Sequence, residues 1–199
     1  MKKIILALLV VIMAMAPVMA DENWVGVDLD VPIGIIPGDY VTTTTTSIEG
    51  TVRGAFYFNR AETMGVGVSV GFGSMLSQSY EGHSMEMSSN FTLSPAVTFQ
   101  YRLELNDDMD LRFGLGMAYD HMFYTDSTDA SSYSTGSIQI AAEASFVYSF
   151  DQIGIVAGVD IGVPVYTFVL ATAFGRTEST PTEQYGVNIT PRVGVSYAF

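Results

Sequence analysis

A strict alternation of apolar and small or polar residues is the feature that most restricts the fold of this 199-residue chain. Between Met64 and Gly73, every second residue is Met, Val or Phe, and the residues between them are Gly and Ser. A period of two is typical of a β-strand, because successive side chains of a strand point to opposite faces of the sheet. The alternation therefore predicts an all-β fold.

The alternation recurs in further segments, and together they predict eight strands. The predicted strands cover residues 24–35, 46–59, 64–73, 91–104, 109–122, 136–150, 153–166 and 185–199. The second, fourth and sixth strands are followed by short connections, and the first, third, fifth and seventh by long polar ones at about 36–45, 75–89, 123–135 and 167–184. This regular change of loop length is typical of an antiparallel up-and-down barrel, with tight turns and both termini at one end.

The N-terminal segment predicts a secretory signal peptide. Lys2 and Lys3 precede an apolar run at residues 4–16, and the small residues Val18 and Ala20 have the spacing that a signal peptidase recognises. The apolar run has thirteen residues, whereas a membrane-spanning helix needs about 20. We expect residues 1–20 to be cleaved and residues 21–199 to form a single exported domain, with an uncleaved N-terminal anchor as the alternative.

Charge and cysteine content exclude several classes of function. After residue 20 the chain has six arginines, no lysine and 21 acidic residues. Such a balance argues against nucleic-acid binding, which needs a cationic surface. The absence of cysteine excludes disulfides, zinc–thiolate sites, a cysteine nucleophile and a lipid anchor on cysteine.

The composition of the two strand faces favours a barrel in lipid over a soluble one. The polar face consists of Gly, Ser, Ala and Thr with a few charged residues, which suits a crowded lumen, and the apolar face carries almost no charge. The strands that descend to the short-turn end finish in aromatic residues, as expected at a membrane interface. These residues are Phe56, Phe58, Tyr101, Tyr148, Phe150, Tyr197 and Phe199.

The C-terminal segment resembles the assembly signal of bacterial outer-membrane barrels. The resemblance is carried by Pro191, Val193, Val195, Tyr197 and the terminal Phe199. The chain is similar to the small families of outer membrane proteins A, X and W and to the lipid A-modifying barrels. The resemblance implies an eight-stranded transmembrane β-barrel in the outer membrane of a Gram-negative-type envelope. It also implies contact with outer-membrane lipid, and recognition by the barrel-assembly machinery through Tyr197 and Phe199.

Three prolines depart from a regular strand pattern. Pro95, Pro164 and Pro191 lie inside predicted strands, where each removes a hydrogen-bond donor from the ladder. We expect a local bulge near each of them.

Charged residues on the inward parity predict ion pairs in the lumen. Glu143, Asp160 and Arg192 each lie seven residues from the short-turn end of their strands, so we expect Arg192 to meet Glu143, Asp160 and Asp30. Arg53 would pair with Asp28 or Glu49. We interpret this network as a plug rather than as a selectivity filter, because eight strands leave little free cross-section. The predicted network comprises Asp28, Asp30, Glu49, Arg53, Arg102, Arg112, Glu143, Asp160 and Arg192.

Two features of the long-loop end bear on function. Residues 42–46 are five consecutive threonines, which favours a strand that extends beyond the membrane and offers an edge to a partner strand. If the parity continues, the apolar side chains of Ile36, Tyr166, Phe168 and Leu170 form an apolar mouth at the top of the lumen.

The chain offers little for catalysis or for a cofactor. His121 has outward parity, but its neighbour Asp120 points the other way and no serine stands two residues away. His83, Met85 and Met87 could hold Cu(I), but methionine is frequent here, and a coincidence explains the grouping better. We therefore expect no enzymatic activity, no metal and no cofactor.

The function predicted from the sequence is that of a porin-like surface barrel without a catalytic site. Its extracellular loops would mediate surface interaction or support membrane integrity, with an extracellular protein as a possible partner. The alternative is a conduit for small hydrophobic ligands through the apolar mouth. A lipid A-modifying enzyme and a narrow ion channel rank below both.

Overall fold

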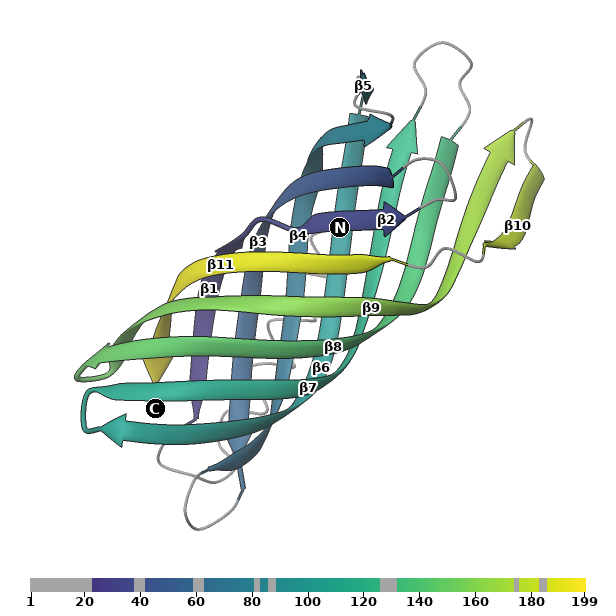
Figure 1. Ribbon diagram of the computed structural model, residues 1–199. Helices are drawn as coiled ribbons and strands as arrows, with labels where there is room; N and C mark the ends of the chain where they lie inside the picture. The colour runs from purple at the N-terminus through teal and green to yellow at the C-terminus, as the bar shows by residue number, and fades with distance from the viewer. Residues whose placement is uncertain are drawn as a thin grey trace.

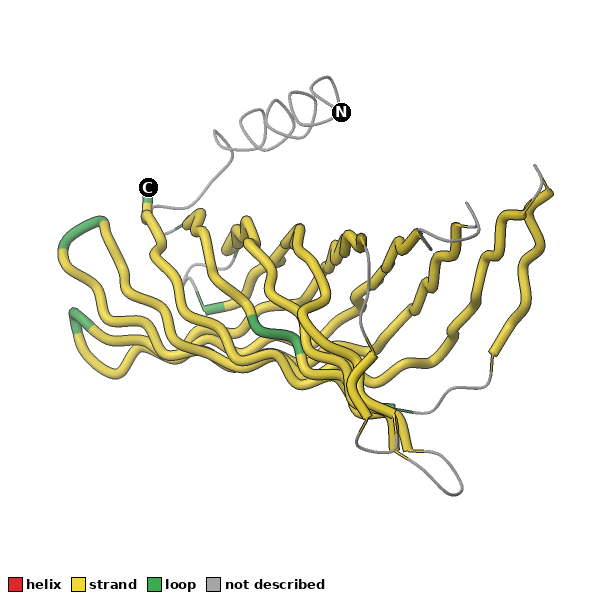
Figure 2. The backbone as a smooth tube through the Cα atoms, turned by 90° about the horizontal axis from the view of Figure 1, so that it is seen from above, coloured by secondary structure: helices red, strands yellow, loops and turns green. Residues whose placement is uncertain are grey.

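The computed structural model describes residues 23–37, 42–58, 63–80, 83–85, 89–125, 132–173, 176–182 and 186–199. Strands make up almost all of these residues (Figure 2). No helix among them is long and apolar enough to cross a membrane. The strands are β1 (Trp24–Asp30), β2 (Ile33–Pro37), β3 (Thr42–Tyr57), β4 (Met64–Tyr80), β5 (His83–Met85), β6 (Ser89–Asn106), β7 (Met109–Thr125), β8 (Ser132–Phe150), β9 (Ile153–Ala173), β10 (Arg176–Thr182) and β11 (Val187–Ala198).

The strands close into an antiparallel ring, as predicted (Figure 1). Neighbours in sequence pair from β3 through β4, β6, β7 and β8 to β9. The last strand, β11, pairs with β9 on one side and with β1 on the other, and β1 pairs in turn with β3. Counting β1 and β2 as one interrupted strand gives the eight strands of the predicted up-and-down barrel. Trp24 lies opposite Ala198, so both ends of the described chain are at the end that carries the short turns.

The first strand of the ring is interrupted at Val31 and Pro32. The backbone N–H of Val31 donates to the carbonyl oxygen of Pro191 at 3.0 Å, and the carbonyl of Pro32 accepts from Ser47 at 2.9 Å. Pairing with β3 resumes in the same register at Ile33. The two prolines cannot donate to the ladder, and they therefore divide the strand without shifting it.

Among the three prolines for which we expected bulges, the prediction is confirmed at Pro164 only. Gln139 of β8 pairs with Pro164 and Ile138 pairs with Tyr166, which leaves Val165 as an extra residue in β9. Near Pro95 the ladder between β6 and β7 lacks pairs but keeps its register. Pro191 stays in the ladder with β9, opposite the break between β1 and β2. The expectation of bulges at Pro95 and Pro191 was therefore wrong.

Apolar side chains cover the outside of the ring, and polar ones fill its interior. Leu115 is 62% exposed, Val97 57% and Val163 49%, although all three lie well inside long strands. The buried set, in contrast, includes Asp28, Arg53 and other charged or polar residues. This inverted distribution fits a solvent of hydrocarbon, because the outer face buries its apolar area only against lipid.

Strands continue into regions that we expected to be loops, and the sheet divides there. Residues 42–46 form the start of β3, as predicted, but they pair with β2 on one side and with β4 on the other, so they offer no free edge. The ladder between β4 and β6 ends at Gly73 and Thr92. The ladder between β9 and β11 ends at Gly162 and Asn188. Above these points the described strands form two groups, one from β2 to β5 and one from β6 to β10 (Figure 1).

The side chain of Asn90 joins the two groups where β4 and β6 separate. Its amide oxygen accepts from the Ser74 hydroxyl at 2.7 Å and from the backbone N–H of Met75. Its amide nitrogen donates to the Met75 carbonyl at 3.1 Å. One side chain thus replaces a pair of backbone hydrogen bonds at this seam.

Candidate functional site

Two arginines from strands far apart in the sequence meet at mid-height in the lumen. The ring closes through β1, which places Arg192 of β11 opposite Asp30 and Arg53 of β3 opposite Gly26. On the other side of β11, Glu143 of β8 and Asp160 of β9 are direct cross-strand partners. All these side chains share the inward parity of their strands, so closure of the ring brings them together.

The two guanidinium groups contact four carboxylates, three of which they share. Arg53 contacts Asp28 at 2.7 Å, Asp30 at 2.7 Å, Asp160 at 2.8 Å and Glu143 at 3.6 Å. Arg192 contacts Asp28 at 3.2 Å, Asp160 at 3.2 Å and Glu143 at 3.4 Å. We call these six residues the arginine layer. Its members are Asp28, Asp30, Arg53, Glu143, Asp160 and Arg192.

Glycines on the inward face make room for the arginine layer. A Cβ atom at Gly114 would lie 2.2 Å from the Glu143 carboxylate, and one at Gly194 would lie 2.0 Å from that of Asp28. Larger residues at these positions would displace the two acids from the arginines. The glycine-rich polar face seen in the sequence therefore has a packing reason.

The structure places two predicted residues differently within the network. Asp30 contacts Arg53 rather than Arg192, and Asp28 lies between both arginines. Glu49 has no ion pair with Arg53 and instead accepts a hydrogen bond from Ser94 at 3.3 Å. Strand parity predicted which residues face inward. Which acid pairs with which arginine depends also on side-chain length and on the stagger between strands, and the alternation pattern does not give this stagger.

A second cluster closes the lumen at the turn end. Arg112 contacts Asp110 at 2.9 Å, and its guanidinium carbon lies 4.6 Å from the centre of the Trp24 ring. Arg102 contacts the same carboxylate at 3.3 Å. Tyr57 is 1% exposed and belongs to the buried cluster with Trp24. The sequence pattern did not identify Trp24 and Tyr57 as members of this cluster, although the inward position of Arg112 could have pointed to an aromatic partner.

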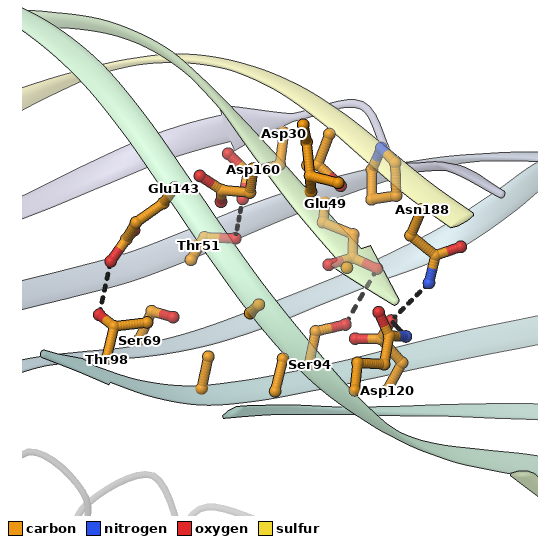
Figure 3. Close-up of a pocket in the computed structure, with 18 of the residues that line it drawn as sticks. Asp30, Glu49, Thr51, Ser69, Ser94, Thr98, Asp120, Glu143, Asp160 and Asn188 are labelled. Carbon is orange, nitrogen blue, oxygen red and sulfur yellow. Dashed lines mark hydrogen bonds between the residues drawn. The ribbon is translucent and has the colours of Figure 1, made fainter. Parts of the chain in front are cut away.

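Above the arginine layer the lumen continues as two adjoining cavities of about 90 and 150 Å³. Figure 3 shows the residues that line the smaller one. Both cavities are lined by Glu49, Ser94, Asp120, Gln139 and Asn188. Asp120 accepts from the amides of Gln139 and Asn188, the latter at 3.2 Å. We call this space the upper lumen. Gln139 and Asn188 share the inward parity, which could have identified them from the sequence.

The predicted apolar mouth does not form as expected. The extra residue Val165 reverses the parity of β9, so Thr167 rather than Tyr166 or Phe168 lines the upper lumen, together with Ile36. Tyr166 is 48% exposed on the outer face, and Phe168 lies opposite Gly136. Leu170 has the same outward parity as Phe168. The placement of Tyr166, Phe168 and Leu170 in the mouth was therefore wrong, because one inserted residue reverses every side chain beyond it.

These outward residues belong to an aromatic belt near the loop end. The ring of Phe168 lies 6.2 Å from that of His121 and 6.0 Å from that of Tyr166. The ring of His121 lies 4.1 Å from that of Phe123, and its Nδ1 atom is hydrogen-bonded to the Tyr119 hydroxyl. The Nε2 atom of His121 has no hydrogen-bond partner among the described residues, so no serine there is paired with it as a nucleophile.

Several features noted in the sequence lie outside the described residues. They include the N-terminal segment 1–20, Met87, and the side chains of His83 and Met85. Within the described ranges, no group of three or more His, Cys, Asp or Glu side chains is arranged to hold a metal ion.

A protein-family model described as "Outer membrane protein beta-barrel domain" matches residues 6–199. None of the curated protein sequences compared with the chain matches it.

Solved structures show the same fold at low sequence identity. OprG from Pseudomonas aeruginosa aligns with a TM-score of 0.62 at 13% identity, covering 89% of this chain and 96% of its own. Neisserial surface protein A aligns with a TM-score of 0.57 at 12% identity, over 89% and 97% of the two chains. The attachment invasion locus protein Ail of Yersinia pestis aligns with a TM-score of 0.54 at 15% identity, over 91% and 100%.

Proposed function

This chain belongs to the outer membrane protein β-barrel domain family, and on that premise we propose that it is a closed, non-enzymatic surface barrel of the outer membrane. Its lumen is plugged by the arginine layer. Its strands and loops outside the membrane mediate contact with a partner or support the integrity of the membrane. The chain reaches this membrane by means of the signal peptide at residues 1–20, and Tyr197 and Phe199 present the C-terminal strand to the assembly machinery.

The arginine layer is the observation that carries this proposal. Its charged groups come from β1, β3, β8, β9 and β11, and they contact one another across the lumen at 2.7–3.6 Å. The side chains of Arg53 and Arg192 are only 9% and 4% exposed. Buried and mutually paired charges of this kind stay in place because separating them leaves unpaired charge in a dry interior. They support a barrel that is shut at mid-height.

The extended strands support a role outside the membrane. β8 and β9 run for 19 and 21 residues, about twice the length that a strand needs to cross the membrane. The similar fold of Ail belongs to a protein described as an attachment invasion locus protein. The environment of His121, with an unpaired Nε2 and aromatic neighbours, favours a structural role over acyl hydrolysis.

Electrical recording tests the plug. The purified protein, inserted into a planar lipid bilayer in potassium chloride, should give no stepwise conductance. Replacing both Arg53 and Arg192 by alanine should either abolish folding or produce conducting events. Stable conductance of the wild-type protein would overturn the proposal of a closed lumen.

Shortening the extracellular sheet tests the surface role. A variant in which residues 168–185 are replaced by a short Gly-Ser linker should still insert, because β9 and β11 pair only up to Gly162 and Asn188. Cells that produce this variant should lose attachment to epithelial cells, or resistance to detergent, compared with cells that produce the wild type. Unchanged attachment and unchanged resistance would contradict a function in this part of the barrel.

A gap in the barrel wall favours a lateral conduit as a second candidate. β11 leaves β9 at Gly162, and β10 joins β9 only at Thr167, so residues 163–166 have no ladder partner on that side among the described residues. Pro164 and Thr167 line the upper lumen at this gap. If solutes pass sideways here, cells that produce the protein should take up N-phenyl-1-naphthylamine faster than cells that lack it. Thr167→Trp, which fills the cavity, should remove the difference.

A further inference from the structure

The upper lumen contains two carboxylates, the buried Glu49 and the half-buried Asp120, that form no ion pair with any arginine whose side chain the structure describes. Glu49 is 6% exposed and accepts from the Ser94 hydroxyl at 3.3 Å. Asp120 accepts from the neutral amides of Gln139 and Asn188. Among the described residues, the ion pairs of the arginines involve Asp28, Asp30, Asp110, Glu143 and Asp160, and they leave out Glu49 and Asp120.

A third carboxylate lines the same space with an oxygen that lacks a partner. Asp30 is 2% exposed, and its Oδ2 atom accepts from the Thr51 hydroxyl at 2.6 Å and from Arg53 at 2.7 Å. Its Oδ1 atom has no hydrogen-bond partner in the described part of the chain. Figure 3 shows Asp30 and Glu49 along one side of the cavity, with Ser94 and Asp120 near Glu49. A buried acceptor without a donor is rare in proteins, and this enclosed oxygen adds uncompensated negative charge to the wall of the cavity.

The excess of acidic side chains makes this space attractive to a positively charged ligand. The arginine layer has two arginines and four carboxylates, and Glu49 and Asp120 add two more acids directly above it. Unpaired buried charges are unfavourable, and the excess is removed either by protons on the carboxylates or by a cation that binds between them. The described acids are not arranged as a metal site, which favours a cation whose hydrogen-bond donors reach separate carboxylates.

The walls of the upper lumen suggest the rest of the ligand. Hydroxyl groups of Thr45, Ser47 and Thr135 surround the larger cavity, and Ile36, Met122 and Pro164 add apolar surface toward its opening. The cavity of about 150 Å³ has room for a molecule of only a few heavy atoms. A short aliphatic chain would contact the apolar side chains while its charged end reaches the acids.

We propose that the upper lumen binds a small organic cation, a primary amine with a short aliphatic body, whose ammonium group lies between Glu49 and Asp120. The ammonium group has three N–H donors, enough for a hydrogen bond to each of the two carboxylates. This proposal goes beyond a plugged barrel, because the ligand enters from the loop end and stops at the arginine layer.

Calorimetry on the protein purified from outer membranes in detergent tests the site. n-Butylamine is titrated at constant ionic strength, and n-butanol serves as the uncharged ligand of the same length. We expect saturable binding of the amine and no binding of the alcohol. Glu49→Gln and Asp120→Asn keep the side-chain shapes, and each should weaken amine binding about tenfold or more by removing a charge-assisted hydrogen bond.

Glu104→Gln is the matched control, because Glu104 is an exposed acid at the opposite end of the barrel. It should leave amine binding unchanged, and each variant should show the same heat-dependent electrophoretic shift as the wild type, which confirms folding. Absence of amine binding to the wild type would overturn the proposal. Equal losses in Glu104→Gln and Glu49→Gln would overturn it too, as would displacement of the amine by equimolar Na⁺ or Mg²⁺. A closed lumen in the conductance test is compatible with any of these results, so the two proposals fail separately.

Discussion

At the scale of single residues, the lumen depends on how many acids one guanidinium group can serve. Arginine has five N–H donors in a rigid plane, and its charge persists in a buried site. Arg53 uses this geometry to contact four carboxylates, and Arg192 contacts three of the same four. A lysine at either position would offer a single point of charge and could not join strands on opposite sides of the lumen.

Removing one of these arginines should destabilise the barrel strongly. Arg192→Met would leave Asp28, Glu143 and Asp160 with one shared arginine, and we expect the free energy of unfolding to fall by about 3–5 kcal/mol. A urea titration in detergent measures the change. Arg102→Met is the control, because the Arg102 side chain is 18% exposed and should cost clearly less. Equal midpoints for the two variants would contradict the importance of the layer.

Glycine positions provide a second test on the same scale. Gly114→Ala places a Cβ atom 2.2 Å from the Glu143 carboxylate. We expect a loss of about 1–3 kcal/mol in the free energy of unfolding, typical of overpacking. Gly50→Ala is the matched substitution, because nothing lies within 4 Å of its Cβ position. Gly50→Ala should leave stability unchanged or raise it slightly, and a similar loss at both sites would refute the packing explanation.

At the scale of elements, regular alternation was enough to predict the strands but not their irregularities. The pattern in residues 64–73 and 91–104 identified β4 and β6, and the five threonines identified the extension of β3. A bulge was expected near Pro164, but the inward side chains of β9 were predicted as if the alternation continued unchanged beyond it. The extra residue Val165 reverses that alternation, so the predicted inward positions of Tyr166 and Phe168 were wrong. The network partners were equally hard to predict, because Asp28 and Asp30 differ only in their height on one strand.

Single cysteines can read the parity change directly, because the chain has none of its own. We expect Thr167→Cys, which lines the upper lumen, to react with a small water-soluble maleimide. A fluorophore attached to the cysteine of Tyr166→Cys should instead lose fluorescence when the lipids carry a spin label, because this side chain faces the membrane. The opposite reactivity would mean that β9 continues without the bulge.

Asn90 provides a test of the seam between β4 and β6. Asn90→Ala removes the hydrogen bonds to Ser74 and Met75, so amide hydrogens in residues 74–80 should exchange faster. Hydrogen exchange followed by mass spectrometry measures this. Asn106→Ala is the control, since its side chain accepts from Asp108 in a turn at the far end. If exchange in residues 74–80 rises equally in both variants, Asn90 does not hold the seam.

At the scale of the whole molecule, the closed ring is the property on which the other predictions depend. A closed barrel with every strand paired on both sides below Gly73 resists detergent until it is heated. The purified protein should therefore migrate differently in electrophoresis before and after boiling. Identical migration, together with solubility in plain buffer, would contradict a transmembrane barrel.

The division of the upper sheet has a mechanical consequence. Below the ends of the β4–β6 and β9–β11 ladders the wall is a closed ring of hydrogen-bonded strands. A force on any one strand is therefore distributed around the whole circumference. Above them each group of strands is an open sheet held only at its lower end, and the sheet bends more easily with distance from the closed ring. A force applied to β9 or β10 from outside the membrane would therefore bend one of the two strand groups while the closed ring in the membrane keeps its shape.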